Sequence, residues 1–257
     1  MSWVAPTSRR FLVALVFLAG CAAAPDATTT TSTTAATPTT TAAPLAMTTS
    51  TPPPTTTTVP LPTTTTVPPA TAFRYEIKTV TADELAHSWH AGCPVEVDDL
   101  VRIEVVHHDF DGAVRSGSIV VHESVASDIA EVFEEMFDAG YPIVSVIPIG
   151  ELPEGAEDTP NYANTSAFHC RFVAGTDRWS EHAFGKAIDI NTHLNPYHQG
   201  DYIWPEGSDR YLDRTLGEPG MIAEGDAVVG AFDDIGWGWG GRWRTSKDYQ
   251  HFSASGR

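Results

Sequence analysis

The sequence predicts a single α+β domain over residues 73–257, in which a small, mainly antiparallel sheet is flanked by helices. Three observations predict this fold class. A strand–turn–strand pattern spans residues 101–122, an amphipathic helix pattern follows over residues 124–140, and further short strand patterns extend to the C-terminal region. Residues 73–257 contain no internal repeat. A domain of this length and aromatic content can bury a substantial core.

Local signals delimit the predicted elements in order. Thr81 and Glu84 have the spacing of a capping box and should begin a helix that ends near residue 92. Asp111-Gly112 predicts a hairpin turn. Ser124 is expected to cap the main helix, and Gly140 to end it. Strand patterns cover residues 73–80, 101–107, 117–122, 143–147 and 168–173, and a final helix pattern covers residues 223–235.

Two segments have loop composition. Residues 150–166 are polar, and residues 193–220 are rich in proline, glycine and aromatic residues. The second segment is expected to form an irregular lid or rim.

Residues 1–21 have the pattern of an export signal. Arg9-Arg10 precede a short apolar run over residues 11–19, and small residues follow. Leu18-Ala-Gly-Cys21 resembles the bacterial lipobox, which predicts lipidation of Cys21 and a lipid anchor in the membrane. The alternative is ordinary signal-peptide cleavage, in which Cys21 has no role.

Residues 22–72 consist almost entirely of threonine, proline, alanine and serine, with Asp26 as the only charged residue. This composition lacks the apolar side chains needed to offset the entropy of ordering, so we expect a disordered linker. If largely polyproline-like at ~3.1 Å per residue, it would reach on the order of 150 Å.

Charge and cysteine content narrow the class of protein. A net charge of −18 argues against binding to nucleic acid or to a membrane through a basic patch. With Cys21 lipidated, Cys93 and Cys170 remain as a pair that can form a disulfide outside the cytoplasm. Two buried free thiols are the alternative.

Two short motifs carry candidate metal ligands. His182 and Asp189 are seven residues apart, and Asp248 precedes His251 by three residues. Two histidines and one carboxylate suffice to hold a catalytic zinc ion with one coordination position open. Asp189 lies between isoleucines, where an ionised carboxylate is costly to bury unless it is paired or metal-bound. Asp248 would remain as a general base.

The spacing also imposes geometric requirements. An odd offset places two residues on opposite faces of a straight strand, so His182 and Asp189 cannot share one strand as ligands. His182 is therefore expected on a loop or short turn, with Gly185 in the bend that leads into the strand of Asp189. The same argument requires a turn or bulge between Asp248 and His251.

The combination of motifs resembles a known family. Ser-x-His-x-x-Gly-x-Ala-x-Asp over residues 180–189, Trp-Gly-Gly-x-Trp over 239–243 and Asp-x-x-His-Phe over 248–252 look like the zinc peptidases of peptidoglycan. This family comprises D-alanyl-D-alanine carboxypeptidases and L-alanyl-D-glutamate endopeptidases, and it shares its metal-site fold with the Hedgehog signalling domain. The resemblance covers most of residues 164–252.

The resemblance implies a role for each matching residue. One zinc ion would be held by His182, Asp189 and His251, with Asp248 as the base. Arg171 resembles the arginine that orients substrate or stabilises an oxyanion, although a structural salt bridge is its alternative. Ser180 matches a residue that lines the substrate pocket. Trp239 is a candidate for substrate binding, with core packing as the alternative for it and for neighbouring tryptophans.

The sequence therefore predicts a monomeric, lipid-anchored, extracytoplasmic zinc peptidase that cuts the stem peptide of the cell wall. Carboxypeptidase and endopeptidase activity both remain open, because the two loop segments determine the shape of the pocket. The alternative from another class is a non-catalytic zinc-containing module that binds the cell wall or takes part in signalling.

Overall fold

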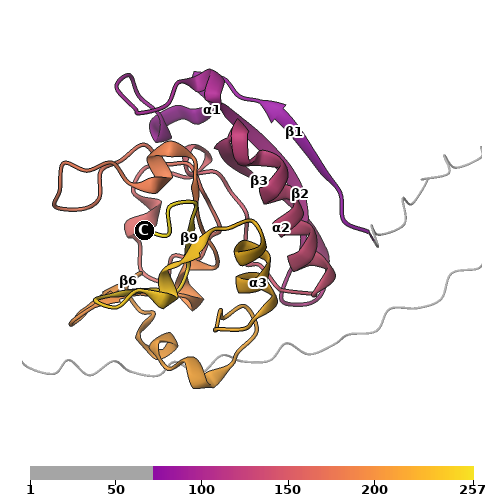
Figure 1. Cartoon of the computed structure of the whole chain (residues 1–257), viewed down its shortest axis with the longest axis vertical. Coiled ribbons are helices and arrows are strands. Elements are labelled where there is room, and N and C mark those ends of the chain that lie inside the picture. The colour runs from indigo at the N-terminus through magenta and orange to yellow at the C-terminus, as the bar shows by residue number, and fades with distance from the viewer. Residues whose placement is uncertain (1–71) are drawn as a thin grey trace, which may run out of the picture. The chain divides into compact units, whose positions relative to one another are not determined.

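The computed structural model describes residues 72–257 (Figure 1). The predicted signal peptide, the lipobox cysteine Cys21 and the linker up to residue 71 lie outside the described residues. The α+β fold class is confirmed: the described chain contains small antiparallel sheets and few helices. The helices are α1 (Ala82–Leu85), α2 (Ala126–Asp138) and α3 (Ala227–Asp234).

The strands form three sheets of three strands each, and every pair within them is antiparallel. The first sheet has the order β1-β2-β3, the second β4-β9-β7 and the third β6-β5-β8. Their bounds are β1 Tyr75–Thr79, β2 Leu100–His108, β3 Val114–His122, β4 Ala187–Asp189, β5 Tyr197–Gln199, β6 Tyr202–Trp204, β7 Gly238–Trp239, β8 Lys247–Asp248 and β9 His251–Ser253.

The β2–β3 hairpin and helix α2 form the framework of the N-terminal half. Alternation along β2 buries Ile103 and Val105 on one face, and α2 packs against β2 (Figure 1). The predicted apolar face of α2 is largely confirmed, because Ile129, Val132 and Phe133 are fully buried. Gly140 follows the helix with a φ of +66°, as the stop signal predicted.

The core continues from this framework into the second sheet. Phe232 of α3 stacks on Phe252 of β9 with ring centroids 4.0 Å apart, and Ile188 of β4 is fully buried in the same cluster. Helix α3 also packs against α2. The second sheet is thus fixed to the large hairpin through a shared apolar core, which gives its strands a rigid base.

Some predicted elements differ from those observed. The capping box of Thr81 and Glu84 forms, but α1 ends at Leu85, where the chain turns through Ala86 at a φ of +45°. Ser124 does not cap α2; its backbone N–H donates to His122 Nδ1, and a 3-10 turn precedes the helix.

The segments 143–147 and 168–173 are not strands. They bond neighbouring backbone only at isolated points, such as Val146 with Thr165 and Phe172 with Trp179. The predicted irregular segment 193–220 contains the short hairpin β5–β6 among 3-10 turns.

Candidate metal centre

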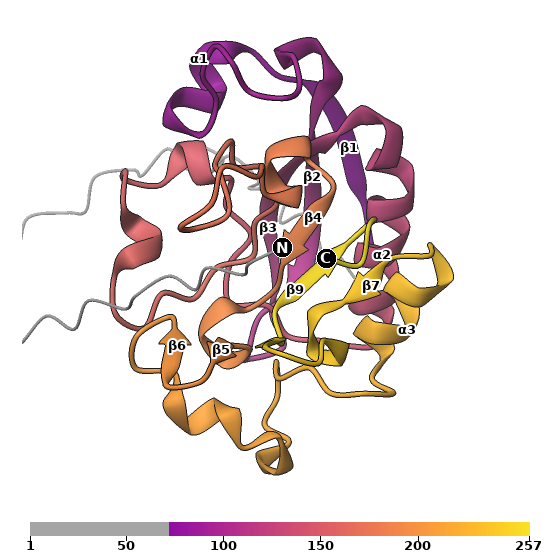
Figure 2. The same cartoon turned by 60° about the vertical axis from the view of Figure 1, so that its left-hand side comes forward.

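The candidate site lies where β4 and β9 run side by side (Figure 2). Asp189, the last residue of β4, is the direct antiparallel partner of His251, the first residue of β9. Their side chains meet, with Asp189 Oδ1 3.0 Å from His251 Nδ1. Residues 62 positions apart in sequence are therefore brought together by strand pairing alone.

His182 enters from a 3-10 helix, Glu181–Phe184, rather than from a strand. Ser180 caps this helix, since its Oγ accepts a hydrogen bond from the backbone N–H of His182. Gly185 follows with a φ of +63°, and a Cβ atom added there would lie 2.5 Å from the backbone nitrogen of His122. The predicted turn with a glycine bend is thus present, and only glycine fits it.

The donor atoms of the three predicted ligands converge. His182 Nε2 lies 3.2 Å from Asp189 Oδ2 and 3.2 Å from His251 Nδ1. Ligand atoms 2.0–2.2 Å from a tetrahedral zinc ion are about 3.3–3.6 Å apart. The donor atoms, 3.0–3.2 Å apart, are close to this spacing, and all three residues are nearly buried.

Backbone carbonyl groups fix the tautomers of both imidazoles. His182 Nδ1 donates to the carbonyl oxygen of Ala167 at 2.6 Å, and His251 Nε2 donates to that of Arg257 at 3.0 Å. A carbonyl oxygen only accepts, so the protons sit on these outer nitrogens in the neutral rings. In the neutral rings the inner nitrogens carry lone pairs that face each other, an arrangement that either a bound cation or a proton shared with Asp189 stabilises.

Electrostatics keep the central carboxylate ionised. Burial opposes ionisation, but His182 and His251 together hold the pKa of Asp189 far below its usual range. Burial likewise opposes a charge on His251, yet the bond to Asp189 raises the pKa of His251 to about 9. The cluster therefore attracts positive charge.

Asp248 lies beside the three ligands but on another sheet. It belongs to β8, pairs with Tyr197 of β5, and is separated from β9 by the break in strand structure that the spacing required. Its Oδ1 is buried without a hydrogen-bond partner in the described part of the chain. Burial, with the nearby charge of Asp189, raises the pKa of Asp248 to about 7, a value suited to a general base.

Glycine allows the backbone around Asp248 to pack closely. A Cβ atom at Gly240 would lie 2.6 Å from the carbonyl oxygen of Asp248, and one at Gly241 would meet the ring of Trp239 at 2.2 Å. Gly240 and Gly241 of the tryptophan motif therefore allow close packing against Asp248 and Trp239.

Arg171 and Trp239, both predicted to bind substrate, differ in their surroundings in the structure. The positive charge of Arg171 contributes to lowering the pKa of Asp248, and Arg171 has no ion pair within 4 Å among residues 72–257. The structure thus shows no salt bridge for Arg171 among the described residues, and its role toward substrate stays a prediction. Trp239 is only 5% exposed, and its indole N–H donates to the carbonyl of Tyr249, so the structure places it in the core rather than in a substrate pocket.

The sequence interpretation did not identify a histidine–carboxylate pair near the site. His169 Nδ1 lies 3.0 Å from Glu157 Oε2, and the backbone N–H of His169 donates to the carbonyl of His182. The alternation of apolar and polar residues in Phe168-His169-Cys170-Arg171 was the available signal. Glu157, in the polar loop, gave none.

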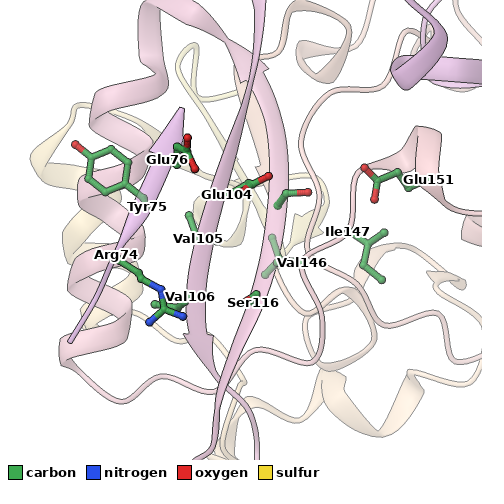
Figure 3. A pocket seen from close by; sticks show the side chains of 12 residues that line it. Arg74, Tyr75, Glu76, Glu104, Val105, Val106, Ser116, Val146, Ile147 and Glu151 are labelled. Atoms are coloured by element: carbon green, nitrogen blue, oxygen red, sulfur yellow. The ribbon is translucent and has the colours of Figure 1, made fainter. Parts of the chain in front are cut away.

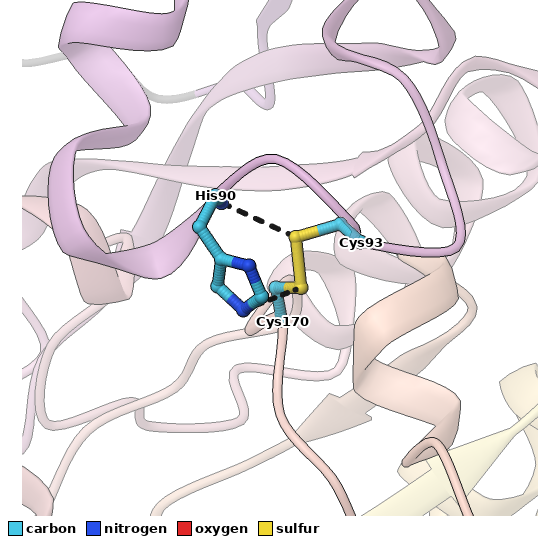
Figure 4. Close-up of side chains that lie close together, drawn as sticks. All are labelled: His90, Cys93 and Cys170. Atoms are coloured by element: carbon cyan, nitrogen blue, oxygen red, sulfur yellow. Dashed lines mark hydrogen bonds between the residues drawn. A yellow bond between two sulfur atoms is a disulfide. The ribbon is translucent and has the colours of Figure 1, made fainter.

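The predicted disulfide between Cys93 and Cys170 is present (Figure 4). His90 lies against it, with Nε2 3.4 Å from Cys170 Sγ and its backbone N–H bonded to Cys93 Sγ. These three residues have the donor types of a metal site, but the disulfide uses both thiols. The disulfide links the loop before β2 to the segment that carries Arg171.

A pocket of about 580 Å³ lies elsewhere, over the first sheet (Figure 3). Strands β1, β2 and β3 and the segment 146–151 line it, with Arg74, Glu104 and Glu151 among the charged residues. None of the predicted site residues lines this pocket, and its mixed charges form no ligand set. The residues that could hold a metal ion lie instead in the β4–β9 cluster.

None of the helices in the described part of the chain has the length and apolar character of a transmembrane span.

Comparison with known proteins agrees with the geometry. Residues 174–254 match the family model described as D-alanyl-D-alanine carboxypeptidase. No curated protein and no solved structure shows significant similarity to this chain. The matched segment contains His182, Asp189, Asp248 and His251, whereas Arg171 and Glu157 precede it. As the sequence resemblance predicted, the segment that carries the metal cluster matches the model of the D-alanyl-D-alanine carboxypeptidase family of peptidases.

Proposed function

We propose that the protein is a zinc peptidase that hydrolyses a peptide bond in the stem peptides of bacterial peptidoglycan. The observation that carries this proposal is the convergence of His182, Asp189 and His251 at ligand spacing beside the buried carboxyl of Asp248. The family match over residues 174–254 supports the peptidase class. We further propose that the metal site has the fold shared by these peptidases and the Hedgehog domain.

His182, Asp189 and His251 would hold one zinc ion, and their donor atoms fit it. Zinc, when bound, supplies a Lewis acid for the scissile carbonyl and makes water a nucleophile at neutral pH. The outer nitrogens of both histidines are held by carbonyl groups, which keeps the inner nitrogens aimed at the site.

Asp248 supplies the acid–base chemistry. Its buried Oδ1 has no partner in the described chain, so it can accept a proton from the attacking water. The same oxygen then donates that proton to the leaving nitrogen of the cleaved bond. Burial is the main cause that keeps the pKa of Asp248 near 7, so both transfers can occur at neutral pH.

Arg171 orients the substrate. Its guanidinium has no ion pair within residues 72–257 and is free to bind a carboxylate or carbonyl oxygen of the peptide. The hydroxyl of Ser180 caps the turn that carries His182 and so stabilises that turn.

The setting outside the cytoplasm is part of the proposal. The disulfide between Cys93 and Cys170 is of the kind that persists in oxidising compartments. We propose that a lipid on Cys21 anchors the chain in the membrane, and that residues 22–72 carry the domain to the cell wall as a monomer.

Hydrolysis of muropeptides by the purified protein tests the proposal. Mass spectrometry of the products identifies the bond and separates carboxypeptidase from endopeptidase activity. Asp248→Asn should lower kcat by roughly 10²–10⁴-fold. The control Asp128→Asn changes an exposed residue on α2 and should retain full activity.

Tight muropeptide binding with bound zinc but no turnover would instead support a non-catalytic wall-binding module. Turnover that is unaffected by Asp248→Asn would contradict the assigned base.

A further inference from the structure

The side chains of Glu157, His169 and Arg171, which we call the charged wall, lie next to the metal cluster. His169 and Arg171 belong to the segment that precedes Ser180. The backbone of this segment runs antiparallel to the turn of His182: the N–H of His169 donates to the carbonyl of His182, and the N–H of Ser180 donates to the carbonyl of Arg171. Phe168 and Cys170 are buried in the core. Because side chains alternate along an extended chain, His169 and Arg171 project to the opposite side, away from that core.

Glu157 of the polar loop completes this wall. Its Oε2 lies 3.0 Å from His169 Nδ1, and about a quarter of its side chain is exposed. Burial opposes its ionisation, but His169, Arg171 and His182 together lower the pKa of Glu157. The carboxylate is therefore ionised and lies within electrostatic range of both the substrate-orienting arginine and a metal ligand.

Tyr162 provides an independent indication of this position. Burial is the main cause that raises the pKa of Tyr162 to about 12, and the carboxylates of Glu157 and Asp189 both contribute. Both carboxylates thus lie within electrostatic range of one phenol. The carboxylate of Glu157 belongs to the surroundings of the metal cluster rather than to a distant part of the loop.

The wall has unused bonding capacity. Glu157 Oε1 has no hydrogen-bond partner among residues 72–257, and no ion pair within 4 Å joins Glu157 to Arg171. An anion and a cation thus stand near each other without neutralising one another. Such a pair is complementary to a ligand that carries both an amino group and a carboxylate.

We propose that Glu157 determines substrate specificity: its carboxylate binds a protonated amino group of the substrate, next to the anionic group held by Arg171. This inference rests on the proposed peptidase function and names a feature of its substrate. Stem peptides built on a diamino acid carry such an amino group. His169, whose Nδ1 lies 3.0 Å from the other oxygen of the carboxylate, is a positioning residue.

Two peptides test the inference: a stem pentapeptide with a free side-chain amino group, and the same peptide with that group acetylated. The wild-type protein should prefer the free amine in kcat/KM by roughly 10–100-fold, the range expected for a hydrogen bond between charged groups. Glu157→Gln should reduce this preference to nearly one. The loss should appear in KM for the free amine, with the acetylated peptide little affected.

Glu154→Gln is the matched control, because Glu154 lies in the same loop and is exposed. It should keep the wild-type preference. Zinc content and thermal stability of Glu157→Gln confirm that the fold is retained. If that variant does not fold, Glu157→Asp preserves the charge and should retain a reduced preference for the amine.

Equal slowing of both peptides by Glu157→Gln would show that Glu157 only holds the loop, and would overturn the inference. Equal turnover of both peptides by the wild type would also overturn it, while leaving the zinc peptidase function intact. If neither peptide is cleaved, the proposed function fails. Calorimetric binding of the two peptides to the zinc-loaded protein then still decides whether the amine is recognised.

Discussion

Asp189 and His251 are direct partners in the antiparallel pair of β4 and β9, and their side chains meet at 3.0 Å. Strand pairing thus sets the distance between two metal ligands, and the glycine-bounded turn of His182 supplies the third. Because neighbouring residues of these strands belong to the hydrophobic core, the fold itself holds the ligands in place.

Asp189→Asn should greatly weaken zinc binding. The carboxylate is the anionic ligand and contacts both imidazoles. Its loss should therefore lower the zinc affinity by more than the roughly 10–100-fold that results from changing a residue outside the ligand set. Competition with a chromogenic chelator measures the affinity. Asp128→Asn serves as the control, and an unchanged affinity in Asp189→Asn would show that the ion binds elsewhere.

Asp248 should destabilise the metal-free protein as the pH rises. Its pKa is about 7 when folded, because of burial, against about 3.9 when unfolded. The folded state binds the proton more tightly, so the free energy of unfolding falls as the pH rises from about 4 through 7. Asp248→Asn removes this titration and should stabilise the metal-free protein at pH ~8, on the order of 2–4 kcal/mol.

Urea unfolding of the chelated protein at pH ~5 and pH ~8 measures this effect. The free energy of unfolding of Asp248→Asn should exceed that of the wild type by more at pH ~8 than at pH ~5, while Asp128→Asn shows no such trend. A constant difference would mean that Asp248 titrates near its unfolded value. The expected combination of gained stability and lost activity is typical of functional residues.

Gly185→Ala should disrupt the turn that carries His182. The added Cβ atom would lie 2.5 Å from a backbone nitrogen of β3, and alanine is also strained at a φ of +63°. Gly175→Ala is the matched control: Gly175 also has a positive φ, of +75°, but no atom lies within 4 Å of an added Cβ.

Both variants should lose about 1–2 kcal/mol of stability through backbone strain. The difference between their losses therefore measures the clash of the Cβ atom added at position 185 with β3, which should cost roughly 1–3 kcal/mol more. Thermal unfolding and zinc affinity are the measurements. Equal effects of the two substitutions would show that the turn of His182 can shift without cost to the site.

Replacing Cys93 and Cys170 by serine should lower stability by roughly 2–5 kcal/mol, since the disulfide closes a loop of 77 residues and restricts the unfolded chain. Zinc content should not change, because neither cysteine contacts the metal cluster. Denaturant unfolding with and without a reducing agent checks both statements. Loss of zinc together with the disulfide would contradict the separation of the two sites.

The metal site was more predictable than the fold around it. The odd spacing between His182 and Asp189 excluded a shared strand, and this required the turn and the glycine bend that are observed. The break between Asp248 and His251 followed from the same argument, and the structure assigns these residues to two different sheets.

Other features depend on contacts that sequence does not reveal. The helix after Thr81 has a proper capping box but ends at Leu85, because tertiary context overrides local preference. The local sequence around Trp239 fits both core packing and a place in a cleft. The burial of its side chain in the structure shows that it packs in the core. Glu157 has no motif at all, and only the folded loop places it near His182.

Zinc-dependent hydrolysis of muropeptides by the protein tests the central claim most directly. Turnover should stop when zinc is removed with a chelator and return with one equivalent of zinc in the wild type, but not in His182→Ala. Turnover that persists in the chelated protein, or full activity of His182→Ala, would contradict the assignment of this cluster as the catalytic metal centre.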